Sequence, residues 1–245
     1  MEDKALLSTE EASGAEKAEL LTVIPAYNEA ENIERVVNHL TANFPQYDYV
    51  VVNDGSRDET AAICQRNGYN LLNLPVNLGL AGAFQAGLKY ADKYGYQYAV
   101  QLDGDGQHRP EYLESMIKKM EEGYDIVIGS RFVGEKKPFT MRMLGSNLIE
   151  MAIRFTTGVN IKDPTSGMRM FSKRMIREFA SGLNYGPEPD TVSYLIRQGA
   201  RVAEVPVIMD ERILGVSYLT PVNAMRYMLK MLISILLIQN FRKRR

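Results

Sequence analysis

Two carboxylates that could bind a metal ion stand close together near the middle of the chain. Asp103 and Asp105 follow an apolar run, and the amide of Gln107 comes two residues later. Their oxygens are hard ligands that suit Mg²⁺ or Mn²⁺, ions that often bridge one or two carboxylates to substrate phosphates. A metal held there would neutralise a departing diphosphate. An isolated Asp-Gly-Asp is also a common acidic surface turn, here before a helix at Pro110, so its surroundings must decide.

A further carboxylate, Asp54, ends another apolar run. An aspartate at the end of a parallel strand faces the ligand crevice and can accept hydrogen bonds from a nucleobase or a ribose. Ser56 and Glu59 are predicted to form a capping box for the next helix. The chain has no Gly-x-Gly-x-x-Gly after its first strand and no Gly-Lys-Ser/Thr loop. Their absence disfavours a dinucleotide oxidoreductase and a P-loop enzyme.

The elements that must position these side chains alternate short apolar runs with helical patterns. This alternation is typical of an α/β fold with a mostly parallel central sheet flanked by helices. Strands are predicted at residues 21–26, 49–53, 69–74, 98–103 and 125–129. Helices are predicted after Glu29, Ser56, Gly79, Pro110 and Met141. Because ligands of open parallel sheets bind beyond the carboxyl ends of the strands, the polar residues there should share one site.

The charges are unevenly distributed along the chain. The 245 residues include 29 Lys or Arg and 30 Asp or Glu, giving a net charge of −1. Residues 1–19 are acidic and lack an apolar core, which predicts a disordered tail. The basic far end lacks the interleaved aromatic residues of a nucleic-acid surface, so we expect no nucleic-acid partner. A single cysteine, Cys64, excludes an intramolecular disulfide and fits a reducing cytoplasm.

Five motifs in order resemble the family 2 glycosyltransferases, above all the branch that makes polyprenyl- and dolichyl-phosphate sugars. They are Val23-Ile-Pro-Ala-Tyr-Asn-Glu29, Val52-Asn-Asp-Gly-Ser56, Asn77-Leu-Gly79, Asp103-Gly-Asp-Gly-Gln-His108 and Gly129-Ser-Arg-Phe132. The resemblance implies a GT-A fold over residues 20–220. It also implies an inverting transfer from a nucleotide diphosphate sugar.

The resemblance further implies roles for particular residues on the donor side. The nucleotide would be held by Pro25, Tyr27, Glu29 and Asp54. The metal ion and the diphosphate would be held by Asp103, Asp105 and Gln107, with Asp105 required for turnover. Arg212 stands in a stretch that resembles a basic loop over the donor phosphates, and would clamp the diphosphate. The motifs favour a UDP sugar over a GDP sugar only weakly, and they do not choose among glucose, N-acetylglucosamine and mannose.

The acceptor phosphate is expected to be bound by the second half of the chain. Arg131 follows the last predicted strand, while Arg142 and Ser146 stand in a segment that resembles the phosphate grip of lipid-phosphate transferases. A guanidinium fork can bind phosphate oxygens bidentately, although both arginines would also suit a solvated surface. Asp163 is expected to shape the acceptor side or to anchor Arg169.

A phosphate acceptor would remove the need for a general base. With a second pKa of about 6, a phosphomonoester is largely dianionic at neutral pH, whereas a hydroxyl acceptor must lose a proton. The leading hypothesis is therefore sugar transfer to a polyprenyl phosphate, such as undecaprenyl phosphate, for modification of cell-envelope glycans. Two alternatives stay open: a family 2 enzyme that extends a saccharide hydroxyl, and a non-catalytic nucleotide-sugar-binding scaffold.

Residues 221–245 are predicted to form an amphipathic helix with a basic end. Eleven residues separate Lys230 from Arg242. They would form about 16 Å of helix at ~1.5 Å per residue, too short for a hydrocarbon core of ~30 Å. We therefore expect a peripheral protein at the cytoplasmic face of the cell membrane, with this helix in the headgroup region. The alternative is packing on the domain's own core or between copies of the chain, and a small membrane partner protein could supply anchoring.

Overall fold

The computed structural model describes residues 19–135, 137–138, 140–181, 188–210 and 221–241. The strands are β1 (Leu20–Ala26), β2 (Asp48–Asn53), β3 (Leu71–Asn73), β4 (Tyr98–Gln101), β5 (Ile126–Ser130), β6 (Arg169–Ser172) and β7 (Val202–Pro206). The helices are α1 (Ile33–Asn43), α2 (Thr60–Arg66), α3 (Gly79–Lys93), α4 (Leu113–Glu121), α5 (Met141–Thr157), α6 (Lys173–Ala180), α7 (Pro189–Arg197) and α8 (Pro221–Leu236), with 3-10 turns at Pro110–Tyr112 and Ile238–Phe241. Of the predicted acidic tail, residues 1–18 lie outside the described residues.

The strands form a seven-stranded sheet in the order β3-β2-β1-β4-β6-β5-β7. The pairs β1–β2, β2–β3, β1–β4 and β5–β7 are parallel, whereas β6 is antiparallel to both of its neighbours, β4 and β5. All strands of this sheet except β6 therefore point the same way. The predicted α/β fold with a mostly parallel sheet is confirmed, although β6 and β7 have no counterpart among the predicted strands.

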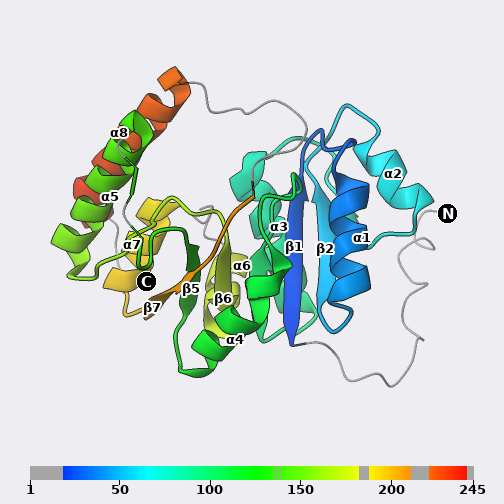
Figure 1. The fold of residues 1–245 in the computed structure, drawn as a ribbon, viewed down its shortest axis with the longest axis horizontal. Helices are drawn as coiled ribbons and strands as arrows, with labels where there is room; N and C mark the ends of the chain where they lie inside the picture. Colours follow the sequence, from blue (N-terminus) through cyan, green and yellow to red (C-terminus); the bar gives the residue numbers. More distant parts are fainter. Residues whose placement is uncertain (1–18, 136, 139, 182–187, 211–220, 242–245) are drawn as a thin grey trace.

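Helices cover both faces of the sheet (Figure 1). Successive residues of a strand point to opposite faces, and β1 shows this clearly. Val23 packs into a core with Phe84 of α3 and Phe179 of α6. Ile24, the next residue, packs into a second core with Met116 of α4. These two cores hold the strands from both sides and so fix the positions of the strand ends.

The C-terminal helix α8 lies beside α5 at one end of the molecule (Figure 1). Met231 and Ile235 of α8 are 3% and 0% exposed, and the hydroxyl of Tyr227 donates a hydrogen bond to Glu188 at the start of α7. This helix thus packs on its own domain and also keeps an exposed side. None of the helices that the structure describes is long and apolar enough to cross a membrane.

Candidate active site

One edge of the sheet collects the predicted site residues. β1, β2, β4, β5 and β7 end at this edge, and the reversed strand β6 begins there. Across the sheet, Asp54 follows β2, Tyr27 follows β1, Asp103 comes shortly after β4, and Arg131 follows β5. Because β6 stands between β4 and β5, the segment that leads into it, residues 163–168, lies between Asp103 and Arg131.

The end of β2 is built against the end of β1 and the segment before α3. The backbone N–H of Asp54 donates to the carbonyl of Ala26 at 2.8 Å, and its Oδ1 accepts from the N–H of Leu78 at 2.7 Å. Gly55 has a φ of 64°, and a Cβ atom there would lie 2.7 Å from the backbone nitrogen of Asn77. These contacts fix the direction of the Asp54 carboxylate, which is buried.

The turn after β1 is braced by the segment before α2. Asn28 has a φ of 56°, and its N–H donates to Ser56 Oγ at 3.0 Å. Ser56 therefore does not cap α2, and the predicted capping box with Glu59 is wrong. The helix begins later, at Thr60, whose N–H donates to the Asp58 carboxylate at 3.0 Å. The serine instead connects the turns that follow β1 and β2.

Asp103, the first predicted metal ligand, is held from two sides. Gln101 Nε2 donates to Asp103 Oδ1 at 2.8 Å, and the N–H of Asp103 donates to His108 Nδ1 at 3.0 Å. Because Nδ1 accepts this bond, the neutral ring carries its proton on Nε2, which lies 3.6 Å from Asp103 Oδ2. The Asp103 side chain is 29% exposed, so an oriented carboxylate still reaches the surface.

The rest of the loop packs against β1 and α1. A Cβ atom on Gly104 would lie 3.0 Å from the carbonyl oxygen of Pro25 and 3.5 Å from Glu29 Cγ. The predicted nucleotide residues and the predicted metal residues are thus neighbours. The carbonyl of Asp105 accepts a hydrogen bond from Arg35 Nη2 at 3.0 Å. The Asp105 side chain is largely buried. Arg35, which the sequence did not single out, helps to hold this loop in place.

Gln107 connects the loop to Asp210, which follows β7. Its N–H donates to Asp105 Oδ1 at 3.0 Å, and its carbonyl accepts from the N–H of Asp210 at 2.9 Å. Arg109 Nε lies 2.9 Å from both carboxylate oxygens of Asp210. This hydrogen-bonded pair holds the pKa of Asp210 below its ordinary value. The predicted diphosphate clamp, Arg212, lies outside the described residues.

The donor set at Asp103 and Asp105 fits an ion that is shared with a substrate. Among the described residues, no group of three His, Cys, Asp or Glu side chains could hold a metal ion alone. Mg²⁺ is usually bound through one or two carboxylates, and water and substrate phosphates complete its shell. The braced carboxylates of this loop therefore suit a metal–diphosphate site and do not suit a closed protein cage.

Arg131 is oriented by the fully buried carboxylate of Asp163. Its Nε, Nη2 and backbone N donate to that carboxylate at 2.7, 2.8 and 3.1 Å. The Arg131 side chain is still 23% exposed, and a guanidinium has further N–H groups to offer an anion. Arg169 Nη2 donates to the carbonyl of Pro164 at 2.7 Å, and the negative charge of Asp163 stabilises the charged form of the buried Arg169 guanidinium. Both roles expected for Asp163 stay predictions.

Gly167 stands in the segment before β6 and lies close to the Asp103 loop. A Cβ atom on Gly167 would lie 3.1 Å from His108 Cε1 and 3.3 Å from Asp103 Oδ2. The segment before β6 thus touches Asp103 through Gly167 and binds Arg131 through Asp163. An arginine suited to an anion is brought next to a loop suited to a metal and a diphosphate.

Of the two predicted acceptor residues on α5, Ser146 is less accessible than Arg131. Ser146 is 0% exposed, and its Oγ has no hydrogen-bond partner among the described residues. Arg142 stands in the first turn of α5, and its side chain is not among those described. A phosphate contact from either residue stays a prediction.

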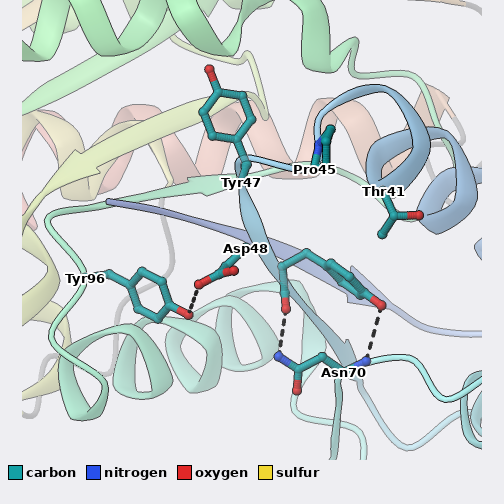
Figure 2. Close-up of a pocket in the computed structure, with 7 residues that line it drawn as sticks. Thr41, Pro45, Tyr47, Asp48, Asn70 and Tyr96 are labelled. Carbon is teal, nitrogen blue, oxygen red and sulfur yellow. Dashed lines mark hydrogen bonds between the residues drawn. The ribbon is translucent and has the colours of Figure 1, made fainter. Parts of the chain in front are cut away.

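A separate hollow lies at the opposite edge of the sheet, near the starts of β2, β3 and β4 (Figure 2). The hydroxyl of Tyr96 donates to Asp48 Oδ2 at 2.8 Å, and Asn70 Nδ2 donates to the carbonyl of Tyr49 at 2.8 Å. These pairs take up part of the polar lining of the hollow. It does not belong to the candidate active site.

The sequence matches a family model and known relatives in agreement with this geometry. Residues 22–179 match the model of glycosyl transferase family 2, and the chain belongs to that family. Polyprenol monophosphomannose synthase of Mycolicibacterium smegmatis is 32% identical over 223 residues, which cover 86% of this chain and 84% of that protein. UDP-N-acetylglucosamine–dolichyl-phosphate N-acetylglucosaminyltransferase of Methanococcus voltae is 30% identical over 210 residues, covering 76% and 83%. The predicted likeness to the polyprenyl-phosphate branch is confirmed.

Solved structures agree with the fold. One is glucosyl-3-phosphoglycerate synthase from Mycobacterium tuberculosis in complex with Mn²⁺, uridine diphosphate and phosphoglyceric acid. It matches with a TM-score of 0.64 at 20% identity, over 92% of this chain and 79% of that one. At this identity the likeness establishes the fold alone, and the predicted GT-A fold is confirmed.

Proposed function

We propose that this glycosyltransferase moves a hexose or N-acetylhexosamine from a nucleotide diphosphate to a polyprenyl phosphate, such as undecaprenyl phosphate, for modification of cell-envelope glycans. The observation that carries the proposal is the segment before β6, which touches Asp103 and binds Arg131. An anion-binding arginine beside a metal–diphosphate loop suits a reaction in which an acceptor phosphate approaches a donor diphosphate. The relatives named for polyprenol and dolichyl phosphate support the acceptor class.

On the donor side, the proposal uses the residues at the ends of β1, β2 and β4. The nucleotide contacts would come from Pro25, Tyr27, Glu29 and Asp54, and the metal contacts from Asp103, Asp105 and Gln107. A bound Mg²⁺ or Mn²⁺ ion supplies positive charge that stabilises the leaving diphosphate. The Mn²⁺ and uridine diphosphate held by the structural neighbour support a divalent metal ion and a nucleoside diphosphate as the ligand class. The weak preference of the motifs for a UDP sugar stays a prediction. The sugar remains a choice among glucose, N-acetylglucosamine and mannose.

On the acceptor side, the phosphate oxygen would attack the sugar without first losing a proton. Arg131 would offset the repulsion between the incoming dianion and the donor diphosphate, with Arg142, Ser146 and Arg212 as further contacts. Asp210, a carboxylate of this edge, is paired with Arg109, and this pairing holds its pKa below the ordinary value. A carboxylate with a lowered pKa is a weak base, which favours an acceptor that needs none.

The identity of the product tests this proposal. Incubation of the purified protein with radiolabelled nucleotide sugars, Mn²⁺ and undecaprenyl phosphate should move the label into a lipid extract. Mild acid should release the labelled sugar from that lipid, because a glycosyl phosphate is acid-labile. Label that appears only on an added saccharide would instead support the hydroxyl-acceptor enzyme. No transfer with any donor, despite nucleotide-sugar binding, would support the non-catalytic scaffold.

We also propose that the protein binds the cytoplasmic face of the membrane through an apolar face shared by α5 and α8. Exposed apolar side chains recur along both helices, at Leu144, Leu148, Met151 and Phe155 of α5 and at Met225, Leu229, Ile233 and Leu236 of α8. Spacings of three and four residues put the members of each set on one side of their helix. Exposed Arg154, Arg226 and Lys230 accompany them and would meet anionic lipid headgroups.

Point substitutions test the membrane proposal better than truncation, because removal of α8 would also remove the buried Met231 and Ile235. Phe155 is 86% exposed and Met151 is 64% exposed. The double substitution Met151→Ser and Phe155→Ser should weaken flotation with anionic liposomes at least about tenfold, since burial of each large apolar side chain contributes ~1.5–3 kcal/mol.

Tyr94→Ser, which removes an exposed aromatic residue at the end of α3, is the matched control and should leave flotation unchanged. A stable dimer that ignores the vesicles, and that dissociates in the double variant, would assign the apolar face to contact between copies instead. Flotation that requires an added small membrane protein would assign the anchoring to that partner.

A further inference from the structure

A glutamine is buried in the middle of the sheet, where apolar residues are the rule. Gln101 is the last residue of β4, is 1% exposed and pairs in register with Val23 of β1. Its Oε1 has no hydrogen-bond partner among the described residues. An unpaired buried polar atom destabilises a fold, and an apolar side chain of similar size would avoid this cost. The packing of the sheet alone therefore gives no reason for an amide at this position.

The amide nitrogen of Gln101 explains why a glutamine stands at this position. Gln101 Nε2 donates to Asp103 Oδ1 at 2.8 Å. The second oxygen of that carboxylate, Oδ2, lies 3.6 Å from His108 Nε2, and the ring is itself held by the N–H of Asp103. Gly167 lies so close that a Cβ atom on it would meet both His108 and Asp103 Oδ2. The carboxylate is thus contacted at each oxygen and has one orientation.

We infer that Gln101 is a positioning residue that sets the orientation of the Asp103 carboxylate for the metal ion and the diphosphate. The inference rests on the proposed function, since it concerns the metal site of that function. A ligand that is already oriented loses less conformational entropy when it binds an ion. Groups that hydrogen-bond to metal ligands commonly change metal affinity by about 10- to 100-fold when they are replaced.

The test variant is Gln101→Met, which keeps the length of the side chain and removes both the donor and the unpaired oxygen. We expect the affinity for Mn²⁺, measured with UDP and separately with GDP by the electron paramagnetic resonance of free Mn²⁺, to fall about tenfold or more. The melting temperature should stay the same or rise. In turnover assays the half-saturating Mn²⁺ concentration should rise, while the KM for the acceptor should not change.

Gln85 offers a matched control. It is another buried glutamine, on α3, and its Nε2 donates to the carbonyl of Phe179 at 3.0 Å, away from the candidate active site. Gln85→Met should lower the melting temperature and leave Mn²⁺ affinity unchanged. Gln101→Met should therefore lower Mn²⁺ affinity without lowering the melting temperature, whereas Gln85→Met should do the reverse.

Three outcomes are distinguishable. If the unaltered protein binds no Mn²⁺ with either nucleotide, the proposed metal site fails, and the inference fails with it. If the unaltered protein binds Mn²⁺ and Gln101→Met binds it equally well, only the positioning role is overturned. If Gln101→Met and the second variant Gln101→Leu both fail to fold, the amide has a structural role, and the positioning role is overturned as well.

Discussion

Replacement of Asp105 by alanine should reduce turnover by roughly 10³-fold, because removal of one group that stabilises a developing charge typically costs that much. The residue stands on the loop after β4, where Asp103 and Gln107 are also held in place. Without its carboxylate, the proposed ion would be held less firmly against the leaving diphosphate. Initial rates across a Mn²⁺ titration, with both substrates saturating, measure the effect.

Asp92→Ala is the control for loss of an acidic residue. Asp92 is a partly exposed aspartate on α3 that lies 4.0 Å from Arg177, so its removal should leave the rate unchanged. The melting temperature of Asp105→Ala should show that the protein still folds. If Asp105→Ala turns over at the normal rate in the presence of a chelator, the metal role of this loop is rejected.

The second large effect is expected at Arg131. Arg131→Ala should raise the KM for the lipid phosphate by roughly 10- to 100-fold and change the KM for the donor much less, because a hydrogen bond to a charged group contributes ~1.5–3 kcal/mol. Steady-state kinetics with both substrates varied would measure the two constants. An equal rise in both values would place Arg131 outside the acceptor site.

Because Arg131 is paired with Asp163, the Arg131→Ala substitution should also affect stability. Arg131→Ala leaves the carboxylate of Asp163 buried without its partner, which should lower the free energy of unfolding by ~3–5 kcal/mol. Arg131→Lys keeps the charge but loses the fork, and so should fold better while it still weakens acceptor binding. Arg174, which forms a similar fork with Asp125 away from this edge, is the control, and Arg174→Ala should leave both KM values unchanged.

The strands up to β5 could be predicted because each is a short apolar run that ends in polar residues. β6 could not, since its four residues include Arg169 and its direction depends on partners far along the chain. Without β6, the placement of Asp163 next to Arg131 is also hidden, because 32 positions separate the two residues. Motif order indicated which residues matter, and only the topology shows which of them meet.

The errors at the level of single side chains have the same cause. Ser56 has the local sequence of a helix cap, yet its hydroxyl accepts from Asn28, a residue 28 positions away. Gln101 reads as one polar residue in an apolar strand, and its bond to Asp103, two positions along the chain, depends on a side-chain orientation that the sequence pattern does not specify. The role of Ser56 comes from a contact between neighbouring strand ends, which a periodic pattern does not encode.

The antiparallel strand β6 lies between the proposed donor-binding residues and the proposed acceptor-binding residues. Residues up to Gln107 form the proposed donor side of this edge, and Arg131 with Asp163 forms the proposed acceptor side, with the ladders of β6 to β4 and β5 between them. Substitutions close to Arg131 are therefore expected to change which lipid phosphate is recognised and to preserve the nucleotide chemistry of the donor side. Such a division offers a physical route for one ancestral scaffold to diversify its acceptors.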